Sequence, residues 1–220
     1  MIQIKEVNDK KTRKLFAVYP LQLYKNCPYY VPSLLSDELG LLNPKKNGSL
    51  KNTKAKAFLC YKDGKLAGRV LGLIPDAEKD KVRFSRIDAV DDIEVFSARI
   101  GAVEKFGLEN GAQYIQGPWG FNDTDREGLL TYGYDKVSTY ATAYSYPYYE
   151  KRIRELGFLG QSKWIEYNFN IPKVSYDRID NLATKLKAKY KLKDLAESMP
   201  VKQIRDKYGN AFFDTLIEGY

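Results

Sequence analysis

The chain has 220 residues, of which 44% are hydrophobic, and this permits one large domain or one domain with an appendage. Its two cysteines, Cys27 and Cys60, lie far apart, and it has no histidine. This composition argues against a disulfide scaffold and an ordinary zinc site. It also excludes Ser-His-Asp and Cys-His catalysis, so proton transfer falls to Glu, Asp, Tyr, Lys or water.

The formal net charge is +8, a surplus that favours anionic partners such as nucleic acid, anionic membranes or phosphorylated ligands. The lysines are dispersed, however, which is typical of a solvated surface. No apolar run approaches the roughly 20 residues that span a bilayer, and residues 1–14 lack the apolar stretch of a signal peptide. We therefore expect a soluble, cytoplasmic protein without a membrane partner.

The first part of the chain predicts a strand followed by helices. Residues 1–7 alternate between apolar and polar side chains, as a half-buried strand does. Asn8 or Asp9 is expected to cap a helix that Pro20 interrupts or kinks. A short helix is expected over residues 33–42.

Three strands in a meander come next. Asp63-Gly64 predicts a tight hairpin turn between the first two of them. The expected strands cover residues 55–61, 66–74 and 82–90.

A long helix follows the meander. Asp91 or Asp92 is expected to cap it, because either carboxylate can accept from free amides at a helix start. Its apolar residues repeat at helical spacing, and Gly111 is expected to end it.

Residues 114–158 carry the most distinctive pattern. A short strand (114–116) leads into Gly117-Pro118 and then into a polar loop with several carboxylates. A tyrosine-rich strand (139–146) and a helix entered through Pro147 are expected to follow. A last strand is expected over residues 163–169.

This order of elements resembles the GNAT (Gcn5-related N-acetyltransferase) superfamily, and more closely a group of bacterial GNAT-like proteins. The resemblance covers about residues 20–172 and implies an α/β (α+β) fold with a mixed, mostly antiparallel central sheet flanked by helices. It rests on the following segments: LYKNCPYYVPSLLSDE, LLNPKKN, GPWGFNDTDREGLL, GYDKVSTYATAYSYPYYEKRIRELGF and KWIEYNFNIP.

The same resemblance implies a domain at 1–172 and a helical extension at 173–220 that leads to a second half. In the extension, amphipathic helices are expected over 177–190 and from about Ser198 to the end. The apolar face at 200–220 predicts a contact with a second domain or a second copy of the chain.

The resemblance further implies acetyl-CoA or another acyl-CoA as the acyl donor and no metal. Family members hold the donor's phosphates at a glycine-rich turn before the long helix. Here the matching stretch is Asp88–Glu94, which contains no glycine and several carboxylates. An acid-capped helix is the plainer interpretation, and the residues that bind the donor are not identified.

Candidate catalytic residues come from the loop after residue 118 and from the helix after Pro147. We predict that Asp125 or Glu127 accepts the proton of an amine substrate. Tyr148 is predicted to protonate the leaving thiolate, although it does not occupy the position of the family's usual tyrosine, where this chain has Ile153. Helix capping is the competing interpretation of the acidic loop.

Candidate substrate contacts come from the same region: Trp119, Asn122, Tyr140, Tyr144 and Tyr146. On a strand over 139–146, the three tyrosines would share one face. That face predicts a wall for a ligand, a stacking platform for bases or ordinary packing.

The leading hypothesis is therefore an acyl-CoA-dependent N-acyltransferase that acts on a small-molecule amine. A non-catalytic GNAT-like half that binds or supports an active half is the second hypothesis. A basic, tyrosine-rich nucleic-acid binder is the third.

Overall fold

The computed structural model describes residues 1–170 and 176–219. Contacts between residues divide the chain into unit 1 (Met1–Ser162) and unit 2 (Lys163–Tyr220). The expected domain boundary after residue 172 lies outside the described residues, so it stays a prediction.

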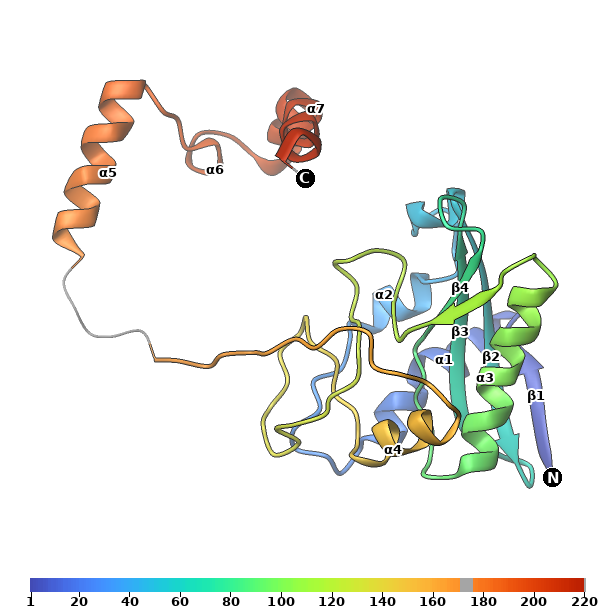
Figure 1. Cartoon of the computed structure of the whole chain (residues 1–220). Coiled ribbons are helices and arrows are strands. Elements are labelled where there is room, and N and C mark those ends of the chain that lie inside the picture. Colours follow the sequence, from blue (N-terminus) through green and yellow to red (C-terminus); the bar gives the residue numbers. More distant parts are fainter. Residues whose placement is uncertain (171–175, 220) are drawn as a thin grey trace. The chain divides into compact units, whose positions relative to one another are not determined.

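Unit 1 is built on a five-stranded sheet (Figure 1). Its strands follow one another in space as they do in sequence, and all neighbours are antiparallel except the last pair, β4 and β5. The strands are β1 (Ile2–Glu6), β2 (Thr53–Lys62), β3 (Lys65–Pro75), β4 (Lys81–Ser85) and β5 (Tyr114–Gln116). The predicted fold class, a mixed and mostly antiparallel sheet flanked by helices, is confirmed.

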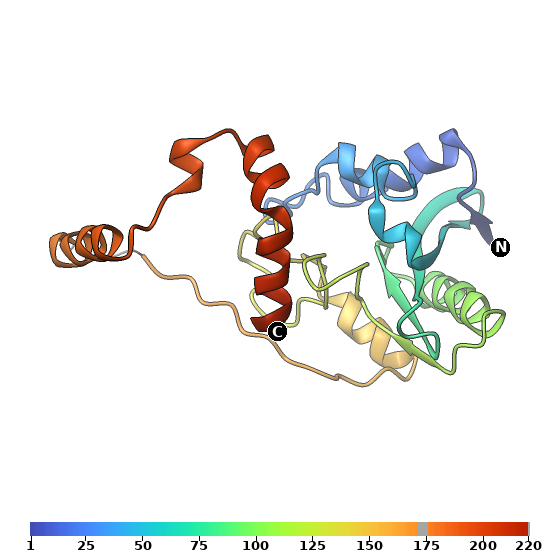
Figure 2. The ribbon, with the colours of Figure 1, turned by 90° about the horizontal axis from the view of Figure 1, so that it is seen from above.

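Helices cover both faces of this sheet. In Figures 1 and 2 the α3 helix lies against one face, while α1 and α2 lie on the opposite side. The helices of unit 1 are α1 (Lys10–Leu23), α2 (Leu35–Gly40), α3 (Ile93–Leu108) and α4 (Tyr148–Glu155), with a short 3-10 helix at Gly48–Lys51.

The alternation of side chains along the strands creates two cores. On β2, Phe58 and Cys60 face α3, whereas Ala57 and Leu59 face α1 and α2. Successive strand residues point to opposite faces, so strands covered on both sides are apolar at nearly every position. This explains the continuous burial of the central strand β3.

Several local predictions are confirmed. Asp63 and Gly64 both have positive φ angles, 50° and 76°, and form the two-residue turn that joins β2 to β3. Asp9 caps α1 and Asp92 caps α3, each through its side-chain oxygen. Pro20 lies inside α1 without ending it.

The predicted tyrosine-rich strand at 139–146 is wrong, because this segment has no regular secondary structure. Side chains bind its backbone instead of a neighbouring strand. The Arg126 guanidinium donates to the Tyr140 carbonyl (2.8 Å), and the Thr139 amide donates to the Thr142 hydroxyl (2.9 Å). These bonds satisfy backbone groups that a strand would place in a ladder.

Two further expectations about elements are wrong. The acidic loop at 121–130 forms turns and bends rather than a capped helix. Residues 163–169 form no strand, and within the described part of unit 2 there is no strand with which they could pair.

Unit 2 contains α5 (Asp177–Tyr190), α6 (Leu195–Ser198) and α7 (Val201–Gly219). The predicted helix at 177–190 is confirmed at both ends. Its C-terminal residue is followed by Lys191 in the left-handed conformation. None of the helices among the described residues combines the length and the apolar character that crossing a membrane requires.

A buried arginine joins α3 to the sheet. The Arg99 side chain donates to the carbonyls of Arg69 (3.0 Å) and Ile87 (2.5 Å), and it is 1% exposed. Gly68 makes room for it, because a Cβ atom at this position would lie 2.7 Å from Arg99 Cδ. The sheet therefore needs a glycine here for the close approach of α3.

We expect Gly68→Ala to destabilise unit 1 by about 1–3 kcal/mol, because the added methyl group overpacks the Arg99 site. Gly101→Ala is the matched control. A Cβ atom at Gly101 would meet nothing within 4 Å, and alanine favours the helix by up to about 1 kcal/mol. Urea denaturation measures the free energy of unfolding of both variants. Equal values for the two variants would contradict the prediction.

Candidate functional site

A β-bulge interrupts the path of β4 immediately after Ser85. Leu71 of β3 pairs with Ser85, and Gly68 pairs with Ala89. Between these two pairs the chain advances four residues after Ser85 but only three along β3, and one extra residue on one strand defines a β-bulge. Arg86 is the extra residue and has a φ of 51°, an uncommon value for a side chain other than glycine.

The bulge changes which face the side chains take. Val82 and Phe84 belong to the core beneath α3, and so do Ile87 and Ala89 beyond the bulge. The extra residue thus shifts the alternation by one position. Ile87 and Ala89 therefore face α3, and the Arg86 side chain points toward α2, where it bonds to Glu38. Bulges re-aim side chains in this way and are frequent beside active sites.

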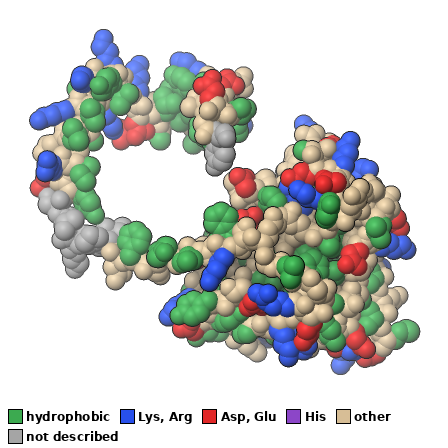
Figure 3. Space-filling view, viewed as in Figure 1, with side chains coloured by type: hydrophobic (Ala, Val, Ile, Leu, Met, Phe, Trp, Pro, Cys, Tyr) green, Lys and Arg blue, Asp and Glu red, His purple; other side chains and the backbone are tan. Residues whose placement is uncertain are grey.

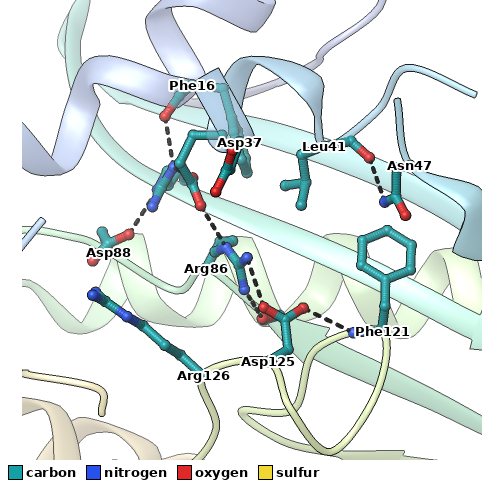
Figure 4. Close-up of polar contacts among 12 residues, drawn as sticks. Phe16, Asp37, Leu41, Asn47, Arg86, Asp88, Phe121, Asp125 and Arg126 are labelled. Atoms are coloured by element: carbon teal, nitrogen blue, oxygen red, sulfur yellow. Dashed lines mark hydrogen bonds and ion pairs between the residues drawn. The ribbon is translucent and has the colours of Figure 1, made fainter. Parts of the chain in front are cut away.

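Glu38 of α2 lies at the centre of a buried ionic network. Its carboxylate pairs with Arg69 (2.7 Å) and Arg86 (3.0 Å), and its side chain is 4% exposed. Arg69 also binds Asp88 (2.6 Å), and Arg86 binds Asp125 (3.0 Å). Figure 4 shows Arg86 extending toward Asp125, so the network connects α2, the sheet and the acidic loop.

The network sets the protonation of Glu38. Burial alone would raise the pKa of this carboxyl, but Arg69 and Arg86 outweigh burial and lower it to about 2. Glu38 is therefore ionised at neutral pH and acts as the shared acceptor of two arginines.

β5 leaves the sheet beside this bulge. It pairs with β4 only from Lys81 to Arg83, and one more bond joins the Trp119 amide to the Phe84 carbonyl (2.8 Å). Beyond that point the two segments separate. Among the described residues, no strand pairs with this edge of the chain from residue 86 to 90.

The direction of the backbone groups along this edge follows from the pairing with β3. Asp88 accepts from the Arg69 amide, and the Val90 amide donates to Ala67. Since backbone groups alternate along an extended chain, those of Ile87 and Ala89 are directed away from β3, although the Ile87 carbonyl is already taken by Arg99 of α3.

Two tyrosines of α4 occupy part of that edge. The Tyr148 hydroxyl donates to the Ala89 carbonyl (2.8 Å), and the Ala89 amide donates to the Tyr149 hydroxyl (2.8 Å). Tyr149 also accepts a bond from the Tyr24 hydroxyl of the segment after α1 (3.1 Å). Burial raises the pKa of all three phenols, which keeps them protonated at neutral pH.

A cavity of about 80 Å³ lies beside the bulge. Its walls come from the bulge, the Gly117-Pro118 segment, the tyrosine-rich segment and the region after α1. Residues that line it include Tyr24, Tyr30, Arg86, Ile87, Tyr144 and Tyr149. Tyr24 stacks on Tyr30 with ring centroids 4.2 Å apart, so aromatic faces form much of the wall.

The three predicted catalytic residues do not line this cavity. Asp125 uses one carboxylate oxygen for Arg86 and the other for the Phe121 amide (3.1 Å). Glu127 is exposed, and within residues 1–170 and 176–219 it has no hydrogen bond or ion pair. Tyr148 contacts the open edge, as described above, and catalysis by these residues stays a prediction.

The five predicted substrate contacts are dispersed. Tyr144 lines the cavity and is 8% exposed, and Tyr146 stacks on Tyr24 (4.9 Å). Tyr140 is exposed, Trp119 packs under the Arg83 guanidinium (3.7 Å), and Asn122 accepts from Thr124 in an exposed turn. The structure thus brings only Tyr144 and Tyr146 to the aromatic wall.

The start of α3 matches the acid-capped interpretation. The Asp92 side chain accepts from the amides of Glu94 and Val95 and pairs with Lys62. Asp91 pairs with Arg152 of α4 (2.7 Å). Carboxylates already satisfy the amides and complement the helix dipole here, so this helix start is not open to a phosphate.

Sequence reasoning missed Glu38, Arg69, Tyr24 and the bulge at Arg86. One signal existed, because Arg69 stands in an otherwise apolar strand and a charged residue there needs a buried partner. Among the described residues, no cluster of three or more His, Cys, Asp or Glu side chains is arranged as metal ligands are.

Comparison with known proteins identifies two relatives by sequence. The chain is 31% identical over 155 residues to Protein YghO of Escherichia coli, a match of 68% of the chain and 40% of YghO. It is 24% identical over 176 residues to a bacterial ceramide synthase of Caulobacter vibrioides, a match of 76% of the chain and 46% of that protein. The chain therefore spans less than half the length of either relative.

Solved structures resemble the chain more distantly. A predicted acetyltransferase of Clostridium acetobutylicum, crystallised with acetyl-CoA, has a TM-score of 0.47 and 10% identity. The likeness covers 76% of the chain and 96% of that protein. No protein-family model matches the chain.

We expect Glu38→Gln to destabilise unit 1 by about 3–5 kcal/mol at pH 7, because it leaves Arg69 and Arg86 buried without their shared charge. The Glu38 pKa is lowered on folding, so its contribution to stability is present above its unfolded pKa. That contribution is lost as the pH falls from about 4.5 toward about 2. As the pH falls over this range, the free energy of unfolding should therefore decrease less for the Glu38 variant than for the parent.

Denaturant unfolding at a series of pH values measures this effect. Glu104→Gln is the control, because Glu104 is exposed on α3. Parallel stability profiles for the parent and the Glu38 variant would contradict the role of the network.

Proposed function

We propose that unit 1 is the acyl-donor domain of an N-acyltransferase of the GNAT type, which moves an acyl group from acyl-CoA to an amine. The observation that carries this proposal is the edge at Ile87–Ala89, which β5 leaves without a neighbouring strand among the described residues and which lies beside a cavity. Side chains bond the Ala89 amide and carbonyl and the Ile87 carbonyl, so the Ile87 amide is the group open to a ligand there, and hydroxyls rather than a strand would have to give way for the rest. An unpaired strand edge binds an extended ligand that has amide groups of its own. The pantetheine arm of acyl-CoA is such a ligand.

The cavity fits the reacting end of this substrate. At about 80 Å³ it exceeds the roughly 10–15 Å³ that one water molecule needs, which leaves room for a short acyl group. A larger acyl chain requires the aromatic wall of Tyr24, Tyr30 and Tyr144 to separate. These rings are held by stacking and hydroxyl contacts rather than by a strand ladder.

The proposed reaction needs one proton acceptor and one proton donor. The amine nitrogen attacks the thioester carbonyl carbon, the C–N bond forms and the C–S bond breaks. Glu127 or Asp125 takes the amine proton, directly or through water, and Tyr148 gives its phenolic proton to the leaving thiolate. Glu127 is the freer of the two carboxylates, since Asp125 already holds Arg86 and the Phe121 amide.

The environment of Tyr148 supports its role. Burial raises the pKa of this phenol, which keeps it protonated at neutral pH but makes it a weaker acid, so the support for its role comes from its position. Its hydroxyl points at the Ala89 carbonyl on the open edge. A thioester bound along that edge would place its sulfur within reach of the same hydroxyl.

The name of one known relative supports the reaction type. Ceramide is the amide of a fatty acid and a long-chain amino alcohol, so the name of the Caulobacter relative denotes formation of an amide at an amine. We extend only this reaction type to the chain, with an amine as the acceptor.

We expect acetyl-CoA to bind the purified chain with a micromolar dissociation constant in low-salt buffer. Isothermal titration calorimetry measures this, with thermal stabilisation of unit 1 as a second readout. Free acetate is the control for the acyl end alone. The absence of both heat and stabilisation would contradict the proposal and favour a non-catalytic module that supports a second domain.

We expect Tyr148→Phe to slow thiol release by about a hundredfold, because it removes the proposed acid. Release of the coenzyme A thiol from acetyl-CoA is followed with a panel of primary amines. Tyr132→Phe is the matched control, since Tyr132 is 91% exposed and is not among the predicted site residues. Unchanged rates in the Tyr148 variant, with acetyl-CoA still bound, would remove this residue from the mechanism.

A further inference from the structure

Helix α5 of unit 2 carries a continuous apolar stripe on its surface. Four large side chains along it are between 39% and 61% exposed: Ile179, Leu182, Leu186 and Tyr190. With about 3.6 residues per turn, they fall within an arc of about 80° on one side of the helix. An exposed stripe of this width needs a partner surface to cover it.

The cations of α5 flank this stripe. At the same helical spacing, Arg178, Lys185 and Lys189 lie along one border of it, and Lys187 lies along the other. The carboxylate of Asp177 lies on the side away from the stripe, and that of Asp180 lies about 20° beyond Lys187. From residue 177 to 193 the chain has six cationic side chains and two carboxylates.

Figure 3 shows lysine and arginine side chains projecting from this helix beside hydrophobic ones. The Lys189 ammonium lies 5.1 Å from the Tyr190 ring centroid, which brings cation and aromatic face together at the C-terminal end of the stripe. The flexible stems of lysine and arginine let a charge stay in a polar layer while the stem follows the apolar side chains.

Helix α7 provides the comparison within the same unit. It also exposes large apolar side chains, Phe212, Phe213, Leu216 and Ile217. Its charges are balanced, however, with three cations and three carboxylates from residue 201 to 219. The surplus of positive charge around an exposed apolar stripe is therefore a property of α5 rather than of every helix in unit 2.

We propose that α5 binds in the plane of an anionic lipid bilayer, with its apolar stripe in the acyl-chain boundary and its cations among the headgroups. An exposed apolar stripe flanked by lysine and arginine is the pattern of an interfacial helix. With 14 residues, α5 is about 21 Å long, too short to cross a hydrocarbon core of about 30 Å. The inference departs from the expectation of no membrane partner and does not depend on the proposed enzymatic function.

The test is partition of the full chain onto lipid vesicles. Vesicles with about one-third phosphatidylglycerol in phosphatidylcholine should bind the chain in low salt, and vesicles of phosphatidylcholine alone should bind it far less. About 1 M salt should release it, because the headgroup attraction is screened beyond a few ångströms. The absence of binding to the anionic vesicles would overturn the proposal.

Two sets of variants tie binding to α5. Each lysine near an anionic surface strengthens partition about fivefold, so replacing Lys185, Lys187 and Lys189 with Gln should weaken it by about a hundredfold. The matched control replaces Lys202, Arg205 and Lys207 of α7 with Gln, which removes the same number of charges, and should leave partition nearly unchanged. Equal losses in the two sets would overturn the assignment to α5.

A variant of the stripe separates a membrane from a protein partner. Leu182→Gln with Leu186→Gln keeps the helix propensity and the charges but removes the apolar contact, so vesicle binding should fall strongly. In sedimentation experiments without lipid, the parent chain should not self-associate through this stripe. Self-association that the variant abolishes is therefore not expected. Such self-association, without vesicle binding, would mean that a second copy of the chain covers the stripe.

Discussion

The carboxylate of Glu38, shared by two buried arginines, is the contact on which the arrangement of unit 1 around its bulge depends. It holds α2 against Arg69 of β3 and against Arg86 in the bulge. Arg86 then fixes the acidic loop through Asp125. A buried ion pair of this kind adds little net stability compared with a well-packed apolar contact, but it is costly to break on one side. Its main effect is therefore on geometry, because it fixes the positions of the bulge, α2 and the acidic loop relative to one another.

Local chemistry made much of the fold predictable. Asp63-Gly64 predicted a tight turn, Asp91 or Asp92 was expected to cap the long helix, and apolar residues at helical spacing marked the face by which that helix packs on the sheet. Each of these depends on residues within a few positions of one another. The same reasoning failed at 139–146, where the alternation of tyrosine and alanine resembled a strand. There Arg126, 14 residues before Tyr140, binds the backbone instead.

The surroundings of the candidate site were not predictable in this way. The partners of Glu38 lie 31 and 48 residues away in the sequence, and Tyr24 reaches Tyr149 across 125 residues. Nothing local marks Arg86 as the extra residue of a bulge, because its positive φ angle belongs to a side chain that rarely adopts one. The acidic loop was predicted as a source of catalytic groups, and one of its carboxylates, Asp125, serves the ionic network. The loop therefore has at least a structural role alongside its proposed chemical one.

The distribution of charge decides how an anionic substrate could approach unit 1. At the start of α3, the amides that could hold a phosphate are taken by Asp92, and the neighbouring carboxylates are paired with Lys62 and Arg152. In the proposed function, the phosphates of an acyl-CoA would therefore bind cationic side chains rather than a ring of amides. Attraction to exposed side chains is screened by salt, whereas contacts in the cavity and along the strand edge are not. The thioester end would then set which substrate binds, and the phosphate end would set how strongly it binds at a given ionic strength.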